Sequence, residues 1–368
     1  MTQQQLTEYN LGQSLDDLSN LDPRGYGVCR ILYDAARQTH GEPLTLHSAK
    51  ELVRIVRQDD FIYILTGFVL RPFKKAETDG IIGSLLFARA LIRAFGAKPV
   101  LVCQEENVQA AHAIAAAIGI HSYNSIDEIR DLPLSVAVVP FTKNKATAEA
   151  QANTLIAQAK PAAVVSIEAP GANSLGEYHN ATGLNMTELE AKLDVLFVRL
   201  QACGVPSFAI GDLGNEIGMG KIASQLARYI PYAGQGRCRC ATTQNITGVK
   251  SDCTGGIAAA TAADHLLTAT VSDWGCYGLI AAIAFLKENL EIMHDAETER
   301  EACVAACRNG MIDMYGDLIP AIDGFGLAIN TSIVTLMREH VREALKLRTT
   351  CKTWFEKVIA LGYYEGKA

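Results

Sequence analysis

The chain has 368 residues, of which 49% are hydrophobic and 20% charged, a composition that excludes a disordered or fibrous protein. Its formal net charge of −7 leaves no basic surplus to neutralise phosphates, so nucleic acid is not an expected partner. The polar N-terminus lacks signal or transit character, and no apolar stretch reaches the ~20 residues of a membrane span. The ten cysteines form no CxxC pair, and Cys238 and Cys240 have no matching pair for a metal. We therefore expect a soluble, cytoplasmic protein with reduced thiols and no membrane partner.

The first regular elements predicted are two strand–helix units. Residues 60–68 form an apolar run that precedes a polar loop and a segment with helical periodicity over 80–96. The run 98–103 comes next, followed by an alanine-rich helix over 107–119 that ends at a glycine suited to a C-terminal cap. The pattern predicts βα units with parallel strands.

The pattern continues to the end of the chain. Further strands are predicted over 134–141, 162–168, 205–212 and 265–271, and helices up to about 158, over 187–204, over 274–289 and over 329–349. This alternation indicates an α/β fold with a mainly parallel sheet, helices on both faces in a Rossmann-like three-layer architecture, and a helical C-terminal part. No linker is evident, so residues 1–368 are expected to form one compact domain, which could have two lobes.

Four segments with polar and glycine residues each follow a predicted strand. They span residues 75–83, 166–183, 211–221 and 272–275. Because the carboxyl ends of parallel strands share one edge of a sheet, ligands of open α/β folds bind there. We expect these four segments to converge on one small ligand.

The sequence ETDG places acidic side chains just before a helix. Glu77 and Asp79 precede Gly80, so the first helical amides could face an anion while Thr78 or Asp79 caps the turn. A cap without any ligand explains the same residues. Glu168 closes an apolar strand, where its carboxylate must be hydrogen-bonded, paired or bound to a metal.

The sequence GDLGNEIGMGK over 211–221 is the most informative segment. Four glycines are interleaved with Asp212, Asn215 and Glu216, a pattern that allows close backbone approach to a ligand. The segment lacks a Walker ending and GxGxxG spacing, so no nucleotide cofactor is expected. The sequence SDWG begins a helix with Asp273 and Trp274, which a cap and a packed ring would also explain.

The eight histidines show neither HxH nor HxxxH spacing. His179, between Tyr178 and Asn180, is the histidine that falls in one of the four segments. A single histidine of this kind is more often a hydrogen-bonded structural residue than a catalyst.

The chain carries these motifs, in chain order: DPRGYG (22–27), TGF with ETDG, SIEAPG with GEYHN and LDVLF, GDLGNEIGMGK, and SDWGCYGL. In these motifs the chain resembles the D-glutamate cyclase-like family, which is related to the C-terminal part of mitochondrial D-glutamate cyclases. The resemblance runs over about 22–330. It implies a carbon–oxygen lyase that reversibly dehydrates D-glutamate to 5-oxo-D-proline, with Mn²⁺ or Mg²⁺ as cofactor. Ala169 and Ala172 stand where the family usually has arginines, and Asp273 where asparagine is more frequent. These departures leave the substrate open among D-glutamate and related acidic amino acids.

The chemistry of ring closure requires a base, an acid or metal, and an oxyanion stabiliser. We assign acid–base work to Glu168, Asp212 and Glu216, with Asp79, Glu168 and Glu216 as metal ligands. Asn215 and the amides of its loop are assigned to the developing oxyanion. The predicted substrate-binding residues come from the same segments: Glu77, Thr78, Asp79, Gly80, Gly171, Tyr178, Asn180, Gly211, Gly214, Asn215, Gly218, Lys221, Asp273 and Trp274.

Two other classes fit the same acidic edge. One is a different metal-dependent enzyme acting on a small acidic or phosphorylated metabolite, and the other is a small-ligand-binding protein without catalysis. The partner expected in each case is a small acidic metabolite. A homo-oligomer is compatible with the sequence.

Overall fold

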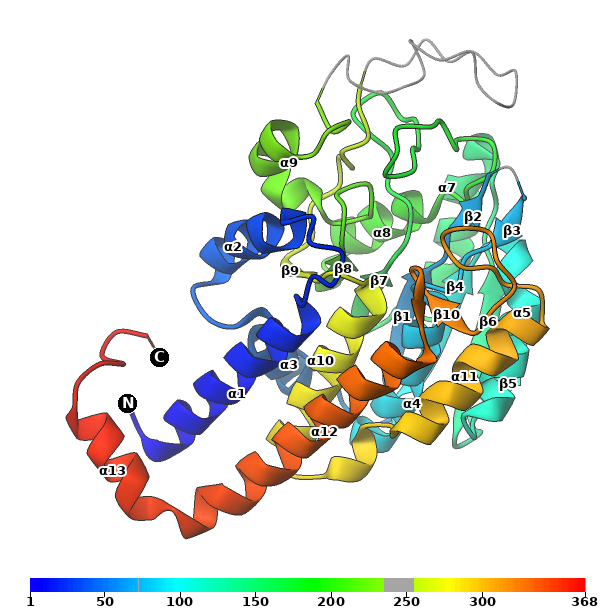
Figure 1. Cartoon of the computed structure of the whole chain (residues 1–368). Helices are drawn as coiled ribbons and strands as arrows, with labels where there is room; N and C mark the ends of the chain where they lie inside the picture. The colour runs from blue at the N-terminus through cyan, green and yellow to red at the C-terminus, as the bar shows by residue number, and fades with distance from the viewer. Residues whose placement is uncertain (72, 235–254, 368) are drawn as a thin grey trace.

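The computed structural model describes residues 1–71, 73–234 and 255–367. Cys238 and Cys240, where no metal site is expected, lie outside the described residues. The centre of the fold is a seven-stranded parallel sheet with the order β5-β6-β4-β1-β7-β8-β9 (Figure 1). Its strands are β1 Phe61–Thr66, β4 Lys98–Cys103, β5 His121–Tyr123, β6 Ser135–Pro140, β7 Ala163–Ile167, β8 Ser207–Gly211 and β9 His265–Thr268.

The order of the strands creates a switch point in the middle of the sheet. From β1 the chain moves outward to β4 and the edge strand β5, inserts β6 between these two, and then returns to place β7 on the other side of β1. The loops that follow β1 and β7 therefore leave the sheet in opposite directions and open a crevice between them. The central strands are rich in valine and isoleucine and are buried on both faces, as parallel strands require.

Helices cover the sheet on two sides because right-handed crossovers in opposite directions deposit them on opposite faces. The outward half carries α4 Ile81–Phe95 and α5 Glu105–Ala117, and the return carries α7 Lys145–Gln158 and α8 Leu193–Ala202. Helix α10, Ser272–Leu286, is buried along almost its whole length and packs against α3, α4 and α12. The start of this central helix is consequently held firmly beside the crevice.

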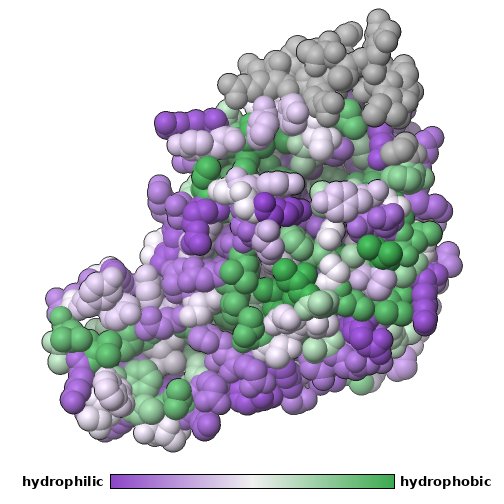
Figure 2. Space-filling model, viewed as in Figure 1, coloured by the Kyte–Doolittle hydropathy of each residue, from purple (hydrophilic) through white to green (hydrophobic). Residues whose placement is uncertain are grey.

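The remaining helices surround this core. They are α1 Gln3–Ser19, α2 Val28–His40, α3 Leu44–Ile55, α6 Ile126–Ile129, α9 Ala223–Tyr229, α11 Ala296–Arg308, α12 Leu327–Thr350 and α13 Lys352–Ala360. Two short hairpins, β2 Val69–Leu70 with β3 Lys75–Ala76 and β10 Ala321–Ile322 with β11 Phe325–Gly326, complete the fold. Over the end formed by α13, Figure 2 shows mixed apolar and hydrophilic side chains, in keeping with exposed Trp354 and Leu361.

A buried carboxylate ties α1 to α3. Asp16 accepts hydrogen bonds from the amides of Leu44 (2.7 Å) and Thr45 (3.0 Å), which lie in the first turn of α3. Its carboxylate also accepts from the Thr45 and Tyr33 hydroxyls. These bonds satisfy helix amides that have no partner within the helix, so Asp16 positions α3 against the core.

The predicted α/β class and parallel sheet are confirmed, and α5 ends at Ala117, two residues before Gly119. The helix predicted over 187–204 begins only at Leu193, which corrects the sequence interpretation. Residues 187–190 form a turn whose carbonyls at Thr187 and Glu190 accept hydrogen bonds from Lys192 Nζ. These two carbonyls accept hydrogen bonds from a side chain and not from helix amides. No helix in the described part of the chain is long and apolar enough to cross a membrane.

Candidate active site

A small cavity of about 120 Å³ lies at the switch point, beyond the carboxyl ends of β1, β7 and β8. Residues from three of the four predicted segments line it, with others from neighbouring loops: Phe68, Leu70, Glu77, Asp79, Glu168, Asn180, Ala181, Thr182, Asp212, Leu213, Asn215, Met314 and Asp323. Six of these are residues that the sequence pattern predicted for the site. Three of the four predicted segments therefore meet at the cavity, and the fourth, 272–275, reaches it through a hydrogen bond from Ser272 to Glu168.

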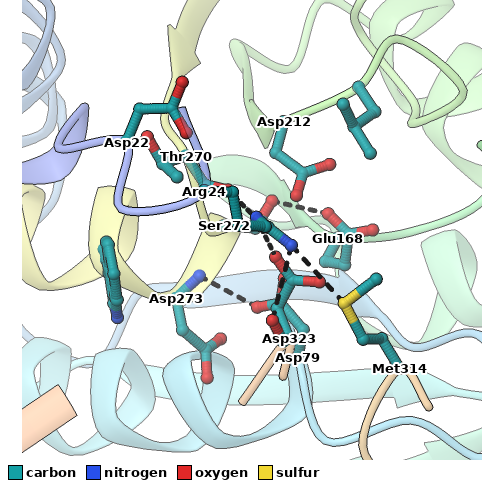
Figure 3. A network of polar contacts seen from close by, with 12 residues as sticks. Asp22, Arg24, Asp79, Glu168, Asp212, Thr270, Ser272, Asp273, Met314 and Asp323 are labelled. Carbon is teal, nitrogen blue, oxygen red and sulfur yellow. Dashed lines mark hydrogen bonds and ion pairs between the residues drawn. The ribbon is translucent and has the colours of Figure 1, made fainter. Parts of the chain in front are cut away.

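Three buried carboxylates meet at this cavity. Asp79, Glu168 and Asp212 each present an oxygen within 4.8 Å of the others. They follow β1, β7 and β8 respectively, so neighbouring parallel strands bring them together. Figure 3 shows the three side chains pointing toward one another.

Asp79 and Asp273 hold the starts of two helices against each other. The Asp79 carboxylate accepts the amide of Asp273 in the first turn of α10 (3.1 Å), and Asp273 Oδ1 accepts the amide of Gly80 before α4 (2.9 Å). Asp79, which precedes α4, therefore accepts an amide at the start of α10, and Asp273, in the first turn of α10, accepts an amide at the start of α4. The predicted side-chain cap of α4 by Thr78 or Asp79 is wrong, because the N-cap of α4 is Gly80, without a side-chain cap bond. Asp79 accepts the amides of Gly80 and of Asp273 in α10 instead.

Glu168 occupies a strained and crowded position. Its φ of 43° lies in the left-handed region, which is uncommon for a residue other than glycine. Ser272 at the start of α10 donates a 2.6 Å hydrogen bond to Glu168 Oε2. A Cβ atom on Gly80 would lie 2.6 Å from the Glu168 Cβ, so only glycine fits there. The backbone strain and the close packing together fix the carboxylate at the cavity.

The glycine-rich loop after β8 is organised around Glu216. The Glu216 carboxylate accepts the amides of Asp212 (3.3 Å), Leu213 (3.0 Å) and Gly214 (2.7 Å). Glu216 is completely buried and does not line the cavity. The structure therefore brings Asp212, and not Glu216, into the cluster with Asp79 and Glu168.

The predicted glycines shape the same loop. At Gly218 φ is 96°, and an added Cβ would lie 2.2 Å from the Ala209 Cβ. Gly171, Gly211 and Gly214 are similarly packed against neighbouring chain. Asn215 lines the cavity, where its Nδ2 donates to the His179 carbonyl (3.1 Å) while its buried Oδ1 has no hydrogen-bond partner among the described residues.

Burial and mutual repulsion dominate the electrostatics of the cavity. The pKa of Glu168 is raised well above its usual value by burial and by the charges of Glu216 and Asp79. The pKa values of Asp212 and Glu77 are raised well above the usual range for the same two kinds of reason. Burial, with the charge of Asp323, raises the pKa of Asp79 to about 7 despite its amide hydrogen bonds. Such carboxyl groups can hold protons at neutral pH.

Arg24 is a cation beside the cavity that the sequence interpretation did not assign to the site. Its guanidinium bonds the Asp323 carboxylate at 2.6 Å and the Thr270 carbonyl at 3.3 Å (Figure 3). Burial alone would lower the pKa of Arg24, but the hydrogen bond and charge of Asp323 raise it. Asp22 accepts the amides of Gly25 and Gly27 and so shapes the turn that carries Arg24. The DPRGYG segment could have indicated this role, because it places an arginine within a tight turn.

Ten of the fourteen predicted substrate-binding residues do not line the cavity: the five glycines, Asp273, Thr78, Tyr178, Lys221 and Trp274. The Tyr178 hydroxyl donates to Asp194, and the Trp274 ring is fully buried, where it donates to Asn330 Oδ1 (2.8 Å). Thr78 is fully buried as well. Lys221 is exposed and reaches the Asp264 carbonyl (3.3 Å), just before β9 and thus at the opposite edge of the sheet.

The donor atoms at the cavity suit a hard divalent cation. Mg²⁺ and Mn²⁺ prefer oxygen ligands, and Asp79, Glu168 and Asp212 offer three carboxylates at mutual distances that one ion could bridge. Burial first and neighbouring negative charges second raise the pKa values of these three carboxyl groups, and a bound cation would favour their ionised forms.

A doubly wound parallel sheet with a buried carboxylate cluster at its switch point defines an α/β protein with a site for a small ligand. A family model described as "D-glutamate cyclase-like, C-terminal" matches residues 15–338, and the chain belongs to this family. Human mitochondrial D-glutamate cyclase is 32% identical over 124 residues, which are 33% of this chain and 17% of the human protein. The resemblance seen in the motifs is thus confirmed, and it extends slightly beyond both predicted ends.

Proposed function

We propose that the cavity catalyses the reversible cyclisation of D-glutamate, or of a related acidic amino acid, to 5-oxo-D-proline or the corresponding lactam. The proposal is carried by the three buried carboxylates of Asp79, Glu168 and Asp212, which lie within 4.8 Å of one another. The family membership supports it, and the cavity of about 120 Å³ suits a small metabolite better than a nucleotide.

Cyclisation forms a bond between the α-nitrogen and the γ-carboxyl carbon and breaks one carbon–oxygen bond. Starting from the α-ammonium and the γ-carboxylate, the nitrogen loses two protons, and the departing oxygen gains two and leaves as water. The reaction therefore needs one group that accepts a proton and another that donates one. A cavity with several carboxyl groups of raised pKa can supply both forms at neutral pH.

The positions of the residues suggest their roles. Asp212 and Glu168 would share the proton transfers, with the Ser272 hydroxyl orienting Glu168 Oε2. The buried Oδ1 of Asn215, which has no hydrogen-bond partner within the described residues, would accept an N–H of the substrate amine. This differs from the oxyanion role predicted for Asn215, because its Nδ2 already donates to the His179 carbonyl.

A cation must compensate the negative charge of an acidic substrate. A divalent ion held by Asp79, Glu168 and Asp212, Mn²⁺ or Mg²⁺, would lower the repulsion and polarise the γ-carboxyl group. Arg24 provides a positive charge beside Asp323 at the same cavity. No arginine is available at Ala169, which is fully buried, so recognition of the substrate carboxylate must use other groups.

The proposal is tested with purified protein and three compounds: D-glutamate, L-glutamate and 5-oxo-D-proline. Ring formation or opening is followed by NMR with and without Mn²⁺. The expected result is conversion that depends on the cation and is lost in Asp212→Asn. Asp131→Asn, which removes an exposed carboxylate elsewhere, serves as the matched control and should behave as the native chain.

Other outcomes point to the remaining classes. Stabilisation by an acidic metabolite without turnover of any of these compounds would indicate a binding protein. Release of phosphate from a small phosphorylated metabolite would indicate a different metal-dependent enzyme.

A further inference from the structure

Three histidines gather at the amino-terminal edge of the sheet, the edge opposite the acidic cavity. His265 begins β9, His40 ends α2 and His47 lies in the first turn of α3. One ring nitrogen from each lies within 4.8 Å of the other two, and all three side chains are half-buried. Helices α2 and α3 both pack against β9, which brings these residues together (Figure 1).

The rings are oriented by specific neighbours. His47 Nε2 lies 2.9 Å from His265 Nδ1, and His47 Nδ1 lies 2.9 Å from Glu42 Oε1. The Glu42 carboxylate can only accept, so Nδ1 of His47 carries the proton and Nε2 turns its lone pair toward His265. A carboxylate that holds the outer nitrogen of an imidazole is the usual support of a metal-binding histidine.

The other two rings are also held. His40 stacks on His47 with centroids 4.2 Å apart, and Phe208 stacks on His265 at 4.5 Å. His40 Nε2 accepts a long hydrogen bond, 3.3 Å, from the Leu266 amide, so a metal ion would replace a weak contact there.

The charges near the cluster are mixed. Glu42, Glu51 and Asp264 place negative charge near the rings, and Lys221 places positive charge there. Lys50 is also near the cluster, but its charge is paired with Glu42, since its Nζ lies 3.0 Å from Glu42 Oε2. Acidic groups outnumber the cations, which favours a bound divalent ion.

We propose that His40, His47 and His265 bind a Zn²⁺ ion. Zinc in proteins is held tetrahedrally at ~2.0–2.1 Å from imidazole nitrogens, which places neighbouring donor nitrogens ~3.3 Å apart. The 2.9 Å between His47 and His265 nitrogens is close to that spacing. Three protein ligands leave the fourth position to water. Imidazole ligands select zinc over the magnesium or manganese that carboxylates prefer.

The ion would have a structural effect on the N-terminal helices. Its ligands come from the end of α2, the start of α3 and the start of β9, so binding ties both helices to the edge of the sheet. A hydrogen-bond relay from His265 through His47 to Glu42 is the alternative that needs no metal. The zinc site and the hydrogen-bond relay are distinguished by whether the native chain binds zinc.

The experiment uses the full chain after dialysis against a chelator. Co²⁺ is titrated first, because tetrahedral nitrogen ligation gives strong visible absorption whereas an octahedral carboxylate site gives weak absorption. We expect strong bands that saturate at one equivalent, are bleached by one equivalent of Zn²⁺, and accompany a rise in the thermal unfolding midpoint. Weak bands only, or no displacement by Zn²⁺, would overturn the proposal and favour the relay.

Variants assign the ligands. His47→Gln should abolish the strong Co²⁺ bands, and Glu42→Gln should raise the Kd for Zn²⁺ by roughly 10- to 100-fold through loss of the supporting carboxylate. His112→Gln is the matched control, since His112 is half-buried and hydrogen-bonded to Ser122, outside the cluster. If His47→Gln does not fold, Glu42→Gln carries the test. Unchanged zinc affinity in the folded variants would overturn the assignment.

Discussion

The two edges of the sheet carry clusters of opposite chemical character. At the carboxyl edge, Asp79, Glu168 and Asp212 are buried carboxylates around a small cavity. At the amino edge, His40, His47 and His265 are half-buried imidazoles that join helices to a strand. The carboxylates suit a hard cation, and the imidazoles suit zinc.

The difference follows from the fold. Loops leave a parallel sheet at the carboxyl ends of its strands and can surround a ligand there, whereas the amino ends are reached by the connections that return from helices. We therefore expect reactive groups at the carboxyl edge and groups that support the structure at the amino edge. The following predictions test this separation.

The largest effect is expected at the carboxylate cluster. In the proposed mechanism Asp212 transfers protons and binds the metal, so Asp212→Asn should lower turnover ~10²–10⁴-fold. The thermal midpoint should stay the same or rise, because one of several repelling buried charges is removed. His47→Gln at the other edge should leave turnover of the folded protein unchanged. Equal losses of turnover in both variants would contradict the separation of the two edges.

Arg24→Met is expected to destabilise the fold by about 3 kcal/mol, because it leaves the buried Asp323 carboxylate without its partner. Urea unfolding at pH 7 measures the change. The double variant with Asp323→Asn should recover most of the loss, since the unpaired charge is then absent. A double variant no more stable than Arg24→Met would show that Arg24 acts through contacts other than this ion pair.

Glu216→Gln separates loop support from catalysis. Its carboxylate accepts three amides of its own loop, so loss of the charge should cost about 1.5–3 kcal/mol of unfolding free energy. Turnover should fall less than in Asp212→Asn. An inactive variant as stable as the native chain would instead place Glu216 among the catalytic groups.

Glu190 should make stability depend on pH. Burial raises its pKa from 4.5 to about 8 in the folded state, so folding favours the protonated acid. Its stabilising contribution is complete below pH 4.5 and is lost as the pH rises through about 8. Against Glu190→Gln, the native chain should lose up to ~1.4 kcal/mol per pH unit in this window. Urea unfolding of both chains between pH 5 and 8 checks the slope, and parallel curves would contradict it.

Asp273→Asn should have the smallest effect on stability, and it should raise stability. Asparagine keeps the Oδ1 acceptor for the Gly80 amide, while it removes a buried charge next to Asp79 and Glu299. We expect the thermal midpoint to rise by a few degrees, corresponding to about 1 kcal/mol. A lower midpoint would mean that the Asp273 charge itself supports the two helix starts.

Much of the acidic cavity could be predicted from local sequence. Valine- and isoleucine-rich runs identified the central strands, and Asp79, Glu168 and Asp212 each follow one of them. The rule that parallel strands end at one edge then placed these side chains together without any coordinates. Short strands such as β5 and the two small hairpins were missed, because two or three residues carry too little periodicity to be recognised.

The direction of each side chain and the pairing of distant residues were decided only by the tertiary structure. Glu216 and Asp212 are four residues apart in one loop, and the amides of the folded loop engage Glu216 while Asp212 reaches the cavity. Arg24 meets a partner 299 residues away, and His47 meets His265 across 218 residues. Such contacts depend on how helices pack over a completed sheet, and no local spacing encodes that packing.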